Sequence, residues 1–154
     1  MRKKVFAGLS VTMGILVMSS LLLAHHSDSV FDNERVVTVT GTVIRHEFVN
    51  PHDRIMLSVE EADGQTYEWI VTGGPPAQMR RVGWHDKMFA AGEQLTVTGH
   101  RYRDGRRVMV RGKILRADGK EVPLGGAAGG RFLEEFMEKY KNDKSRFSEI
   151  GKKQ

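Results

Sequence analysis

Hydrophobic and polar residues alternate along the middle of the chain in the pattern of short β-strands. Valines at every second position of residues 37–43 are separated by polar residues or glycine, which is typical of a half-buried strand. Alternation returns in four later segments, at residues 55–59, 67–71, 95–99 and 108–114. Turn signals such as Asp63-Gly64, which favours a tight hairpin, separate the segments. The pattern predicts five strands between residues 35 and 124.

The first predicted strand contains a glycine, Gly41, beyond which the inward-facing positions change. Val37 and Val39 define one parity before the glycine, whereas Ile44 and Phe48 define the other after it. A bulge near Gly41 would produce this change as a long strand bends around a barrel. We therefore expect the first strand to serve two edges of the sheet.

A short helix is predicted between the third and fourth strands. Pro75 and Pro76 can start a helix over residues 77–82, and Gly83 stands where a helix end favours a left-handed residue. Three strands, a helix and two strands are the order of an OB-fold, a five-stranded, partly open Greek-key barrel. The fold class is therefore predicted as mainly β, an OB-fold-like barrel over residues 35–124. A small open sandwich is the alternative.

The chain after the barrel is predicted to form a Gly-rich linker and then an amphipathic helix. The linker covers residues 125–130, and the helix and tail cover residues 131–154. Apolar side chains fall on one helical stripe, consisting of Phe132, Leu133, Phe136, Met137 and Tyr140. Three interpretations of this C-terminal helix remain open: packing against the barrel, docking to a partner, or a mobile tail.

The first 24 residues have the pattern of a signal peptide. Basic residues at positions 2–4 precede an apolar stretch over residues 5–23, and Ala24 offers a small residue for cleavage. An uncleaved membrane anchor is the alternative, because about 20 apolar residues can span a bilayer. We expect a periplasmic protein with a mature N-terminal segment over residues 25–34, and membrane contact only if the leader is uncleaved.

Charge and composition narrow the function classes. The chain has 24 basic and 19 acidic residues, and three of the basic residues lie in the predicted leader, so the remainder carries 21 against 19. A net charge of +2 argues against nonspecific polyanion binding. The chain has no cysteine, which excludes disulfides and thiolate chemistry. No nucleophile elbow, phosphate-binding loop or zinc-protease motif occurs, so we predict a noncatalytic protein rather than an enzyme.

Two loops are the candidate ligand site, because the loops between strands one and two and between strands four and five form the usual mouth of an OB-fold. The candidate ligand-binding residues are Asn50, His52, Arg101, Tyr102 and Arg103. Guanidinium groups suit a small anionic ligand or a carboxylate of a periplasmic partner protein. Nucleic acid is not an expected partner, because the chain is predicted to be exported and its other barrel aromatics face the core.

A metal site is the alternative function. The candidate metal ligands are His25, His26, His52 and His100. Cleavage after Ala24 would place a free amine beside two imidazoles, a donor set that suits copper or zinc. A polar, flexible N-terminus without metal is the other interpretation of the histidine pair.

Several motifs in order resemble the exported bacterial domain-of-unknown-function family numbered 6152. The quoted motifs are Ala24-His25-His26-Ser27, Phe31-Asp32, Val39-Thr40-Gly41-Thr42-Val43, Asn50-Pro51-His52, Arg80-Arg81-Val82-Gly83-Trp84 and Ala91-Gly92-Glu93 through Val97-Thr98-Gly99. Together they span about residues 24–122. The resemblance implies a periplasmic β-barrel domain and brings no established activity, cofactor or catalytic residue.

Overall fold

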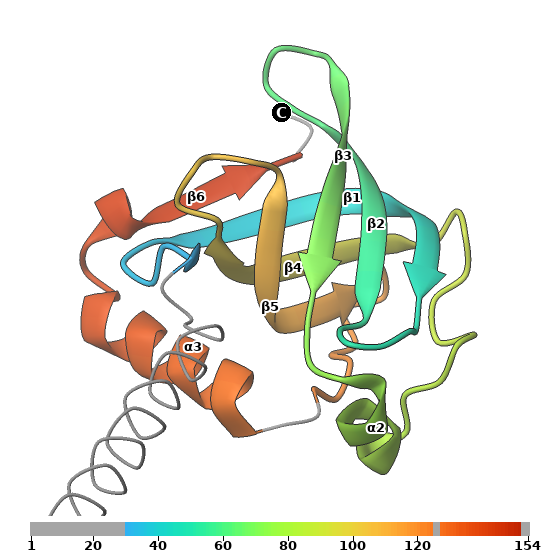
Figure 1. The fold of residues 1–154 in the computed structure, drawn as a ribbon. Coiled ribbons are helices and arrows are strands. Elements are labelled where there is room, and N and C mark those ends of the chain that lie inside the picture. Colours follow the sequence, from blue (N-terminus) through green and yellow to red (C-terminus); the bar gives the residue numbers. More distant parts are fainter. Residues whose placement is uncertain (1–29, 125–126, 152–154) are drawn as a thin grey trace, which may run out of the picture.

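The computed structural model describes residues 30–124 and 127–151, which form a mainly β protein with helices at two places (Figure 1). The strands are β1 (Val36–Glu47), β2 (Arg54–Glu60), β3 (Thr66–Thr72), β4 (Gln94–Arg101), β5 (Val108–Arg116) and β6 (Phe147–Ile150). The helices are α2 (Pro76–Met79), η2 (Arg80–Val82), α3 (Ala127–Tyr140) and η3 (Lys144–Arg146). The mainly β prediction is confirmed. The predicted signal peptide lies outside the described residues.

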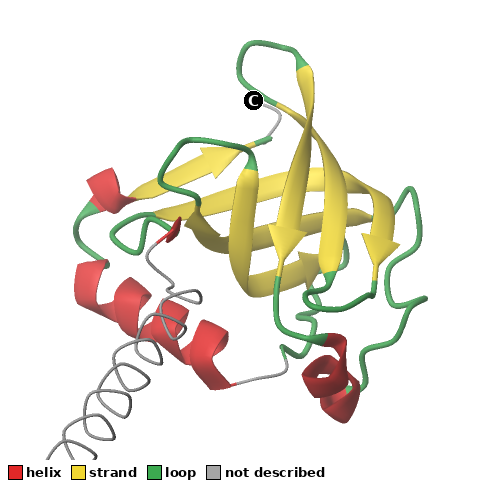
Figure 2. Ribbon diagram, viewed as in Figure 1, coloured by secondary structure: helices red, strands yellow, loops and turns green. Residues whose placement is uncertain are grey.

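The strands form a single sheet that curls back on itself (Figure 2). Its order is β2-β3-β5-β4-β1-β6, and β1 also pairs with β2, so five strands close into a ring. The β3–β5 and β1–β6 pairs are parallel, and the other pairs are antiparallel. The sheet has six strands rather than the predicted five, because the C-terminal strand β6 adds to the edge of β1.

Strand β1 serves two edges of the sheet, as predicted. Its residues 37–42 pair with β4, and its residues 42–47 pair with β2. The register of the β1–β2 pair shifts between Val43 and Arg45, so the bulge lies three residues after Gly41, at Ile44. Ile44 is the extra residue of the bulge and is exposed, so its predicted inward position is wrong. Phe48 is buried, as the changed parity requires.

Gly41 is required by a close approach of strands rather than by the bulge. A Cβ atom at this position would lie 2.7 Å from the carbonyl oxygen of Ser58 and 2.7 Å from a methyl carbon of Val59. The absence of a side chain therefore lets β1 cross close to β2.

The core lies inside the ring and consists of side chains from the inward faces of the strands. Its fully buried members include Val39, Ile55, Leu57, Val59, Trp69, Val71, Leu95, Val97, Met109 and Ile114. Complete burial of such a side chain stabilises a fold by about 1.5–3 kcal/mol. The alternating valines, leucines and isoleucines of the sequence thus supply the inner layer.

The short helical segment after β3 begins and ends where the sequence predicts. Pro75 precedes α2, and Gly83 ends η2 in the left-handed conformation with φ 91°. Met79 is buried and fixes one side of this segment against the barrel. Over residues 30–124 and 127–151, no helix is long and apolar enough to cross a membrane.

The C-terminal segment packs back against the barrel, which decides between the open interpretations. Leu133 and Phe136 are buried with Val36 in a small cluster of their own. Helix α3 begins at Ala127, so residues 127–130 belong to the helix, and the predicted linker over residues 125–130 is wrong there. Packing of the later turns outweighs the glycine penalty of about 1 kcal/mol per residue. The helix ends at Tyr140 rather than near residue 150, because the following segment turns and pairs with β1.

Candidate functional site

The loop between β1 and β2 is held against the end of β3. Nδ1 of His52 donates a hydrogen bond to the carbonyl oxygen of Gly73 over 2.9 Å. The backbone N–H of Asp53 donates to the carbonyl of Gly74, and the N–H of Gly73 donates to the carbonyl of Asp53, each over 3.3 Å. These contacts fix the loop and turn the Asp53 side chain inward.

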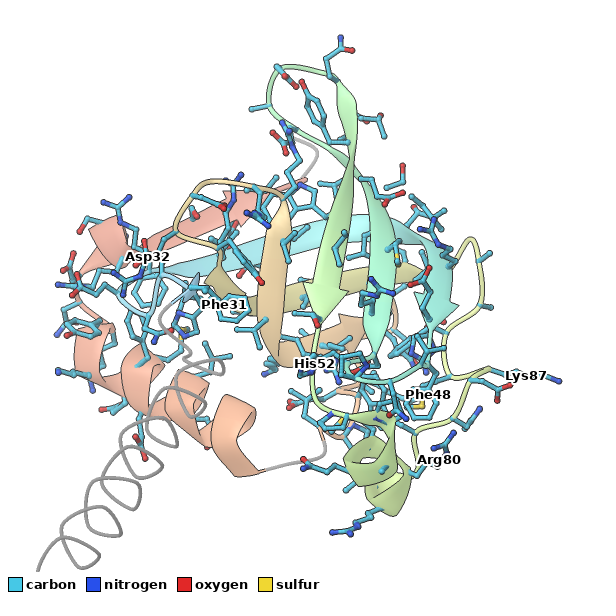
Figure 3. All side chains as sticks on the ribbon, viewed as in Figure 1. Phe31, Asp32, Phe48, His52, Arg80 and Lys87 are labelled. Carbon is cyan, nitrogen blue, oxygen red and sulfur yellow. The ribbon has the colours of Figure 1, made fainter. Side chains whose placement is uncertain are left out.

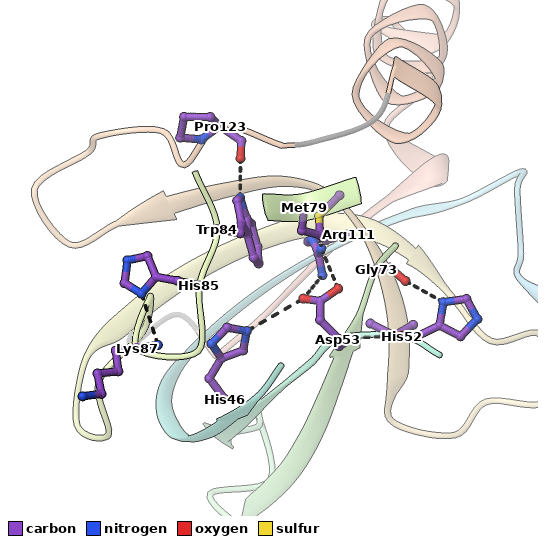
Figure 4. Close-up of polar contacts among 11 residues, drawn as sticks. His46, His52, Asp53, Gly73, Met79, Trp84, His85, Lys87, Arg111 and Pro123 are labelled. Carbon is purple, nitrogen blue, oxygen red and sulfur yellow. Dashed lines mark hydrogen bonds and ion pairs between the residues drawn. The ribbon is translucent and has the colours of Figure 1, made fainter. Parts of the chain in front are cut away.

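A buried ion pair connects this loop to β5. The guanidinium of Arg111 donates two hydrogen bonds of 2.8 Å to the two carboxylate oxygens of Asp53 (Figure 4). The two side chains are 3% and 0% exposed. Gly73 makes room for the pair, because a Cβ atom there would fall on the guanidinium. A buried charge is tolerated only when it is paired, so each group depends on the other.

The segment after α2 covers the ion pair. The ring centroid of Trp84 lies 4.3 Å from the guanidinium carbon of Arg111, which is a cation–π contact. The indole N–H of Trp84 donates to the carbonyl of Pro123 over 2.6 Å. Nη2 of Arg111 lies 3.1 Å from the sulfur of Met79. The guanidinium is thus enclosed by a carboxylate, a ring and a thioether.

His46 completes the buried cluster. Its side chain is 1% exposed, and Nε2 lies 3.9 Å from a carboxylate oxygen of Asp53 (Figure 4). Its ring stands edge to face with the rings of Trp84 and Phe89, at centroid distances of 6.1 and 5.2 Å. Neither ring nitrogen has a hydrogen-bond partner within the described part of the chain. His46 is therefore a packed histidine.

A surface of basic and apolar side chains lies over this cluster. We call it the loop–helix surface and define it by Phe48, Val49, His52, Arg80 and Arg81. Figure 3 shows Phe48, His52 and Arg80 at the same end of the barrel. The guanidinium carbon of Arg80 lies 5.0 Å from the ring centroid of Phe48, and Val49 is 50% exposed. Within residues 30–124 and 127–151, neither Arg80 nor Arg81 forms an ion pair with a carboxylate.

The arginines of the β4–β5 loop, in contrast, are bound within the chain. Arg101 donates to the backbone carbonyls of Gly105 and Arg106, and its guanidinium lies over Trp69 at 5.0 Å. Arg103 donates to the carbonyl of Phe31 over 3.0 Å. These guanidinium groups therefore order the loop.

The aromatic residue of the same loop is also engaged. Tyr102 packs edge to face on Phe31 with 4.7 Å between ring centroids, and the two residues form a β-bridge. Figure 3 shows Phe31 well away from His52. The structure thus places Tyr102 and Arg103 against Phe31 and Arg101 over Trp69, whereas His52 binds the end of β3 and Asn50 is exposed in the same loop as His52. It does not bring the two halves of the predicted mouth together.

The two predicted metal ligands within the described residues also lie apart. His100 is buried on β4, where Nδ1 lies 2.8 Å from the carbonyl of Arg35 and the ring lies 5.4 Å from that of Phe136. His52 binds Gly73 at the end of β3. His25 and His26 lie outside the described residues. Within residues 30–124 and 127–151, no cluster of three His, Cys, Asp or Glu side chains can hold a metal ion.

The sequence interpretation missed Asp53 and Arg111, although one signal was present. Arg111 follows the buried Met109 by two residues on β5, so the period of the strand places a charged side chain on the inward face. A charge on a core-facing position implies a buried partner. The sequence pattern does not identify that partner, which lies 58 residues away.

The pKa of Glu61 is lowered by the hydrogen bonds from Arg107 and, to a smaller extent, from the indole of Trp69. A lowered pKa in the folded state stabilises the fold at pH values above about 4.3, and this contribution disappears as the pH falls through the folded-state pKa. We expect Glu61→Gln to reduce the free energy of unfolding at about pH 6 and to have a smaller effect near about pH 3, where the carboxylate of the unfolded state is protonated. Urea denaturation of both proteins at the two pH values measures this difference. Equal effects at both pH values would contradict the prediction.

The fold and the site define a small β-barrel protein whose buried ion pair supports a loop surface. Residues 14–111 match the sequence profile of a family of unknown function, DUF6152. This range covers more than half of the chain, and the chain belongs to that family.

Solved structures similar to this chain include the following three. The mitochondrial single-stranded DNA binding protein Rim1 of S. cerevisiae has 13% identity and a TM-score of 0.39, with 53% of this chain and 93% of that chain covered. The N-terminal domain of PriB from Thermoanaerobacter tencongensis has 17% identity and a TM-score of 0.38, covering 58% and 98%. The Stn1–Ten1 complex of S. pombe has 12% identity and a TM-score of 0.38, covering 70% and 72%. No curated protein matches the chain significantly.

Proposed function

We propose that this chain is a noncatalytic periplasmic binding or adaptor protein built on an OB-like barrel. The proposed ligand is a small anion or an acidic segment of a partner protein. The proposed site is the loop–helix surface, in which Arg80 and Arg81 take the basic role that the sequence interpretation gave to the β4–β5 loop. His52 keeps its predicted place in the site.

The observation that carries the proposal is that the guanidinium of Arg80 is available to a ligand. Its guanidinium lies over the Phe48 ring, and within the described residues it has no carboxylate partner. A guanidinium stacked on a ring still presents its planar N–H groups to an incoming carboxylate. In the β4–β5 loop, by contrast, Arg101 already donates to two backbone carbonyls and Arg103 to one.

The surface around Arg80 suits a partner with both charge and apolar contact. Val49 and Val82 are 50% and 41% exposed, and Arg81 follows Arg80 directly along the chain. The buried pair of Asp53 and Arg111 fixes the loop beneath them. A surface that is fixed before binding loses little conformational entropy when a ligand arrives, which favours affinity.

Titration of the 15N-labelled protein with succinate and with an acetylated, amidated peptide of sequence EEVEE tests the proposal. We expect amide shifts at residues 48–53 and 79–83. Replacement of both surface arginines, Arg80→Gln with Arg81→Gln, is expected to weaken binding by about tenfold or more, since each charge-assisted hydrogen bond contributes about 1.5–3 kcal/mol in favourable geometry.

The matched control changes the net charge equally at a distance from the surface. Lys120 and Lys141 are exposed, so Lys120→Gln with Lys141→Gln removes two charges without touching the loop–helix surface. This control should leave affinity within about twofold, as expected for distant exposed charges in salt. Shifts centred on the β4–β5 loop, or equal weakening by both double variants, would overturn the proposal.

A further inference from the structure

The outer edge of β1 is shared by two strands of different origin. Strand β2 pairs with its second half, residues 42–47. Along its first half, Val36–Val39, the edge pairs instead with β6 in parallel orientation. The first half of this edge is therefore closed by the C-terminal segment and not by the barrel itself.

The closing segment is an arm that packs on the outside of the barrel around a cluster of its own. We define the α3–β6 arm as residues 127–151. Val36, Leu133 and Phe136 form a cluster separate from the barrel core, with Tyr140 and Phe147 packed against it. Beyond this cluster, Arg146 donates to the carbonyl of Glu34 over 3.1 Å. The arm is thus attached along one side of the barrel (Figure 1).

The part of the β1 edge that pairs with β6 accommodates a simple residue pattern. Phe147 pairs with Val36 and joins the small cluster, and Ile150 pairs with Val39 and packs against the barrel core. The two residues between them, Ser148 and Glu149, are exposed. All four residues pair with β1 along the backbone, and the side chains of the first and the last pack against apolar clusters.

A glycine completes the pattern. Gly151 has φ 81°, and a Cβ atom there would strike the carbonyl oxygen of Thr40 and lie 3.0 Å from a methyl carbon of Val59. The seat therefore fits an aromatic residue, two polar residues, a branched aliphatic residue and a glycine.

The region matched by the family includes the β1 edge but not the α3–β6 arm that pairs with it. Residues 14–111 match the family, so the matched region contains the β1 edge and ends before the α3–β6 arm. An uncovered strand edge presents unpaired N–H and C=O groups, which accept an extended segment by adding it as a further strand.

We infer that the β1 edge at residues 36–40 is a binding site for an extended segment of a partner protein, and that the α3–β6 arm occupies this site within the same chain. The partner segment carries the pattern aromatic, polar, polar, branched aliphatic, glycine. The arm competes at an effective concentration of about millimolar, so the partner binds when the arm is loosened. This site is independent of the loop–helix surface, and either can fail without the other.

The experiment uses the full chain with substitutions in the arm alone. Phe147→Ser with Gly151→Val removes the aromatic anchor and places a side chain against Thr40, while the edge keeps its sequence. The probe is a fluorescein-labelled peptide of residues 143–154 with the natural sequence. We expect this peptide to bind the arm-loosened chain at least tenfold more tightly than the unaltered chain, and to restore slow amide hydrogen exchange at residues 36–40.

A peptide of the same residues carrying the two substitutions is the control. It should bind the arm-loosened chain at least tenfold more weakly than the natural peptide does. The proposal is overturned if residues 147–150 exchange faster in the variant and neither peptide binds, or if both peptides bind equally. It is also overturned if the arm stays docked in the variant, because the β1 edge would then bind a strand that lacks the aromatic residue and the glycine. Protection of residues 36–40 in a dimer without peptide would assign the edge to a second copy and overturn the partner assignment.

Discussion

Replacing Asp53 with alanine is expected to lower the free energy of unfolding by about 3–5 kcal/mol, the range for removal of one partner from a buried ion pair. The substitution leaves the guanidinium of Arg111 buried, because that side chain is 3% exposed and is covered by Trp84. A buried cation without a counter-charge destabilises the folded state far more than the loss of an exposed contact. Urea denaturation followed by circular dichroism measures the change.

A second substitution at the same site separates charge from packing. Asp53→Ala combined with Arg111→Met removes both charges and keeps an unbranched side chain of similar length. We expect the double variant to recover much of the lost stability, because buried ion pairs are often replaced by apolar groups at little cost. A loss below about 1 kcal/mol for Asp53→Ala alone would contradict the assignment of a buried, mutually dependent pair.

Replacing Trp84 with alanine is expected to lower the free energy of unfolding by about 3–5 kcal/mol, the usual range for a buried tryptophan. The ring is 2% exposed, covers Arg111 and fixes the segment after η2 through its hydrogen bond to Pro123. Its removal leaves a cavity beside a buried charge. We expect faster amide exchange over residues 79–90 in addition to the shift in the urea midpoint.

The conservative variant Trp84→Phe identifies the contribution of the ring. Phenylalanine keeps an aromatic face for the guanidinium and loses the N–H that donates to Pro123, so we expect a smaller loss than for alanine. Equal losses for the two variants would show that the hydrogen bond, and not the ring, holds the segment.

The alternating pattern was sufficient to predict the barrel strands, because each strand has one face in the core. Ile55, Leu57 and Val59 show the clearest case, since they face inward at every second position of β2. The short helix was also predictable, because proline before its start and Gly83 at its end have conformations that few other residues adopt.

Two features of the fold depended on contacts that local patterns do not contain. The extra residue of the bulge is Ile44, and nothing in its apolar character separates it from an inward residue. Strand β6 is four residues long and pairs with Val36–Val39, which lie more than a hundred residues earlier. It follows a helical turn, and two of its four residues, Ser148 and Glu149, are polar and exposed, so its strand conformation is determined by its pairing with β1.

The candidate site was less predictable than the fold for a related reason. Composition located the arginines of the β4–β5 loop, but it did not show that Arg101 and Arg103 donate to backbone carbonyls. It also did not distinguish them from Arg80, whose guanidinium lies on a ring. Whether a charged side chain is available to a ligand depends on its folded neighbours, which a single sequence does not specify.

The two tryptophans give the molecule an optical reporter in each of two regions of the barrel. Trp69 lies in the core beneath the guanidinium of Arg101, and Trp84 lies beneath the loop–helix surface against Arg111. They are the only tryptophans in the chain. Emission from a chain with phenylalanine at one of these positions therefore comes from the other alone. Opening of the barrel near the β4–β5 loop and opening of the loop–helix surface can thus be timed separately by fluorescence, without attaching a dye.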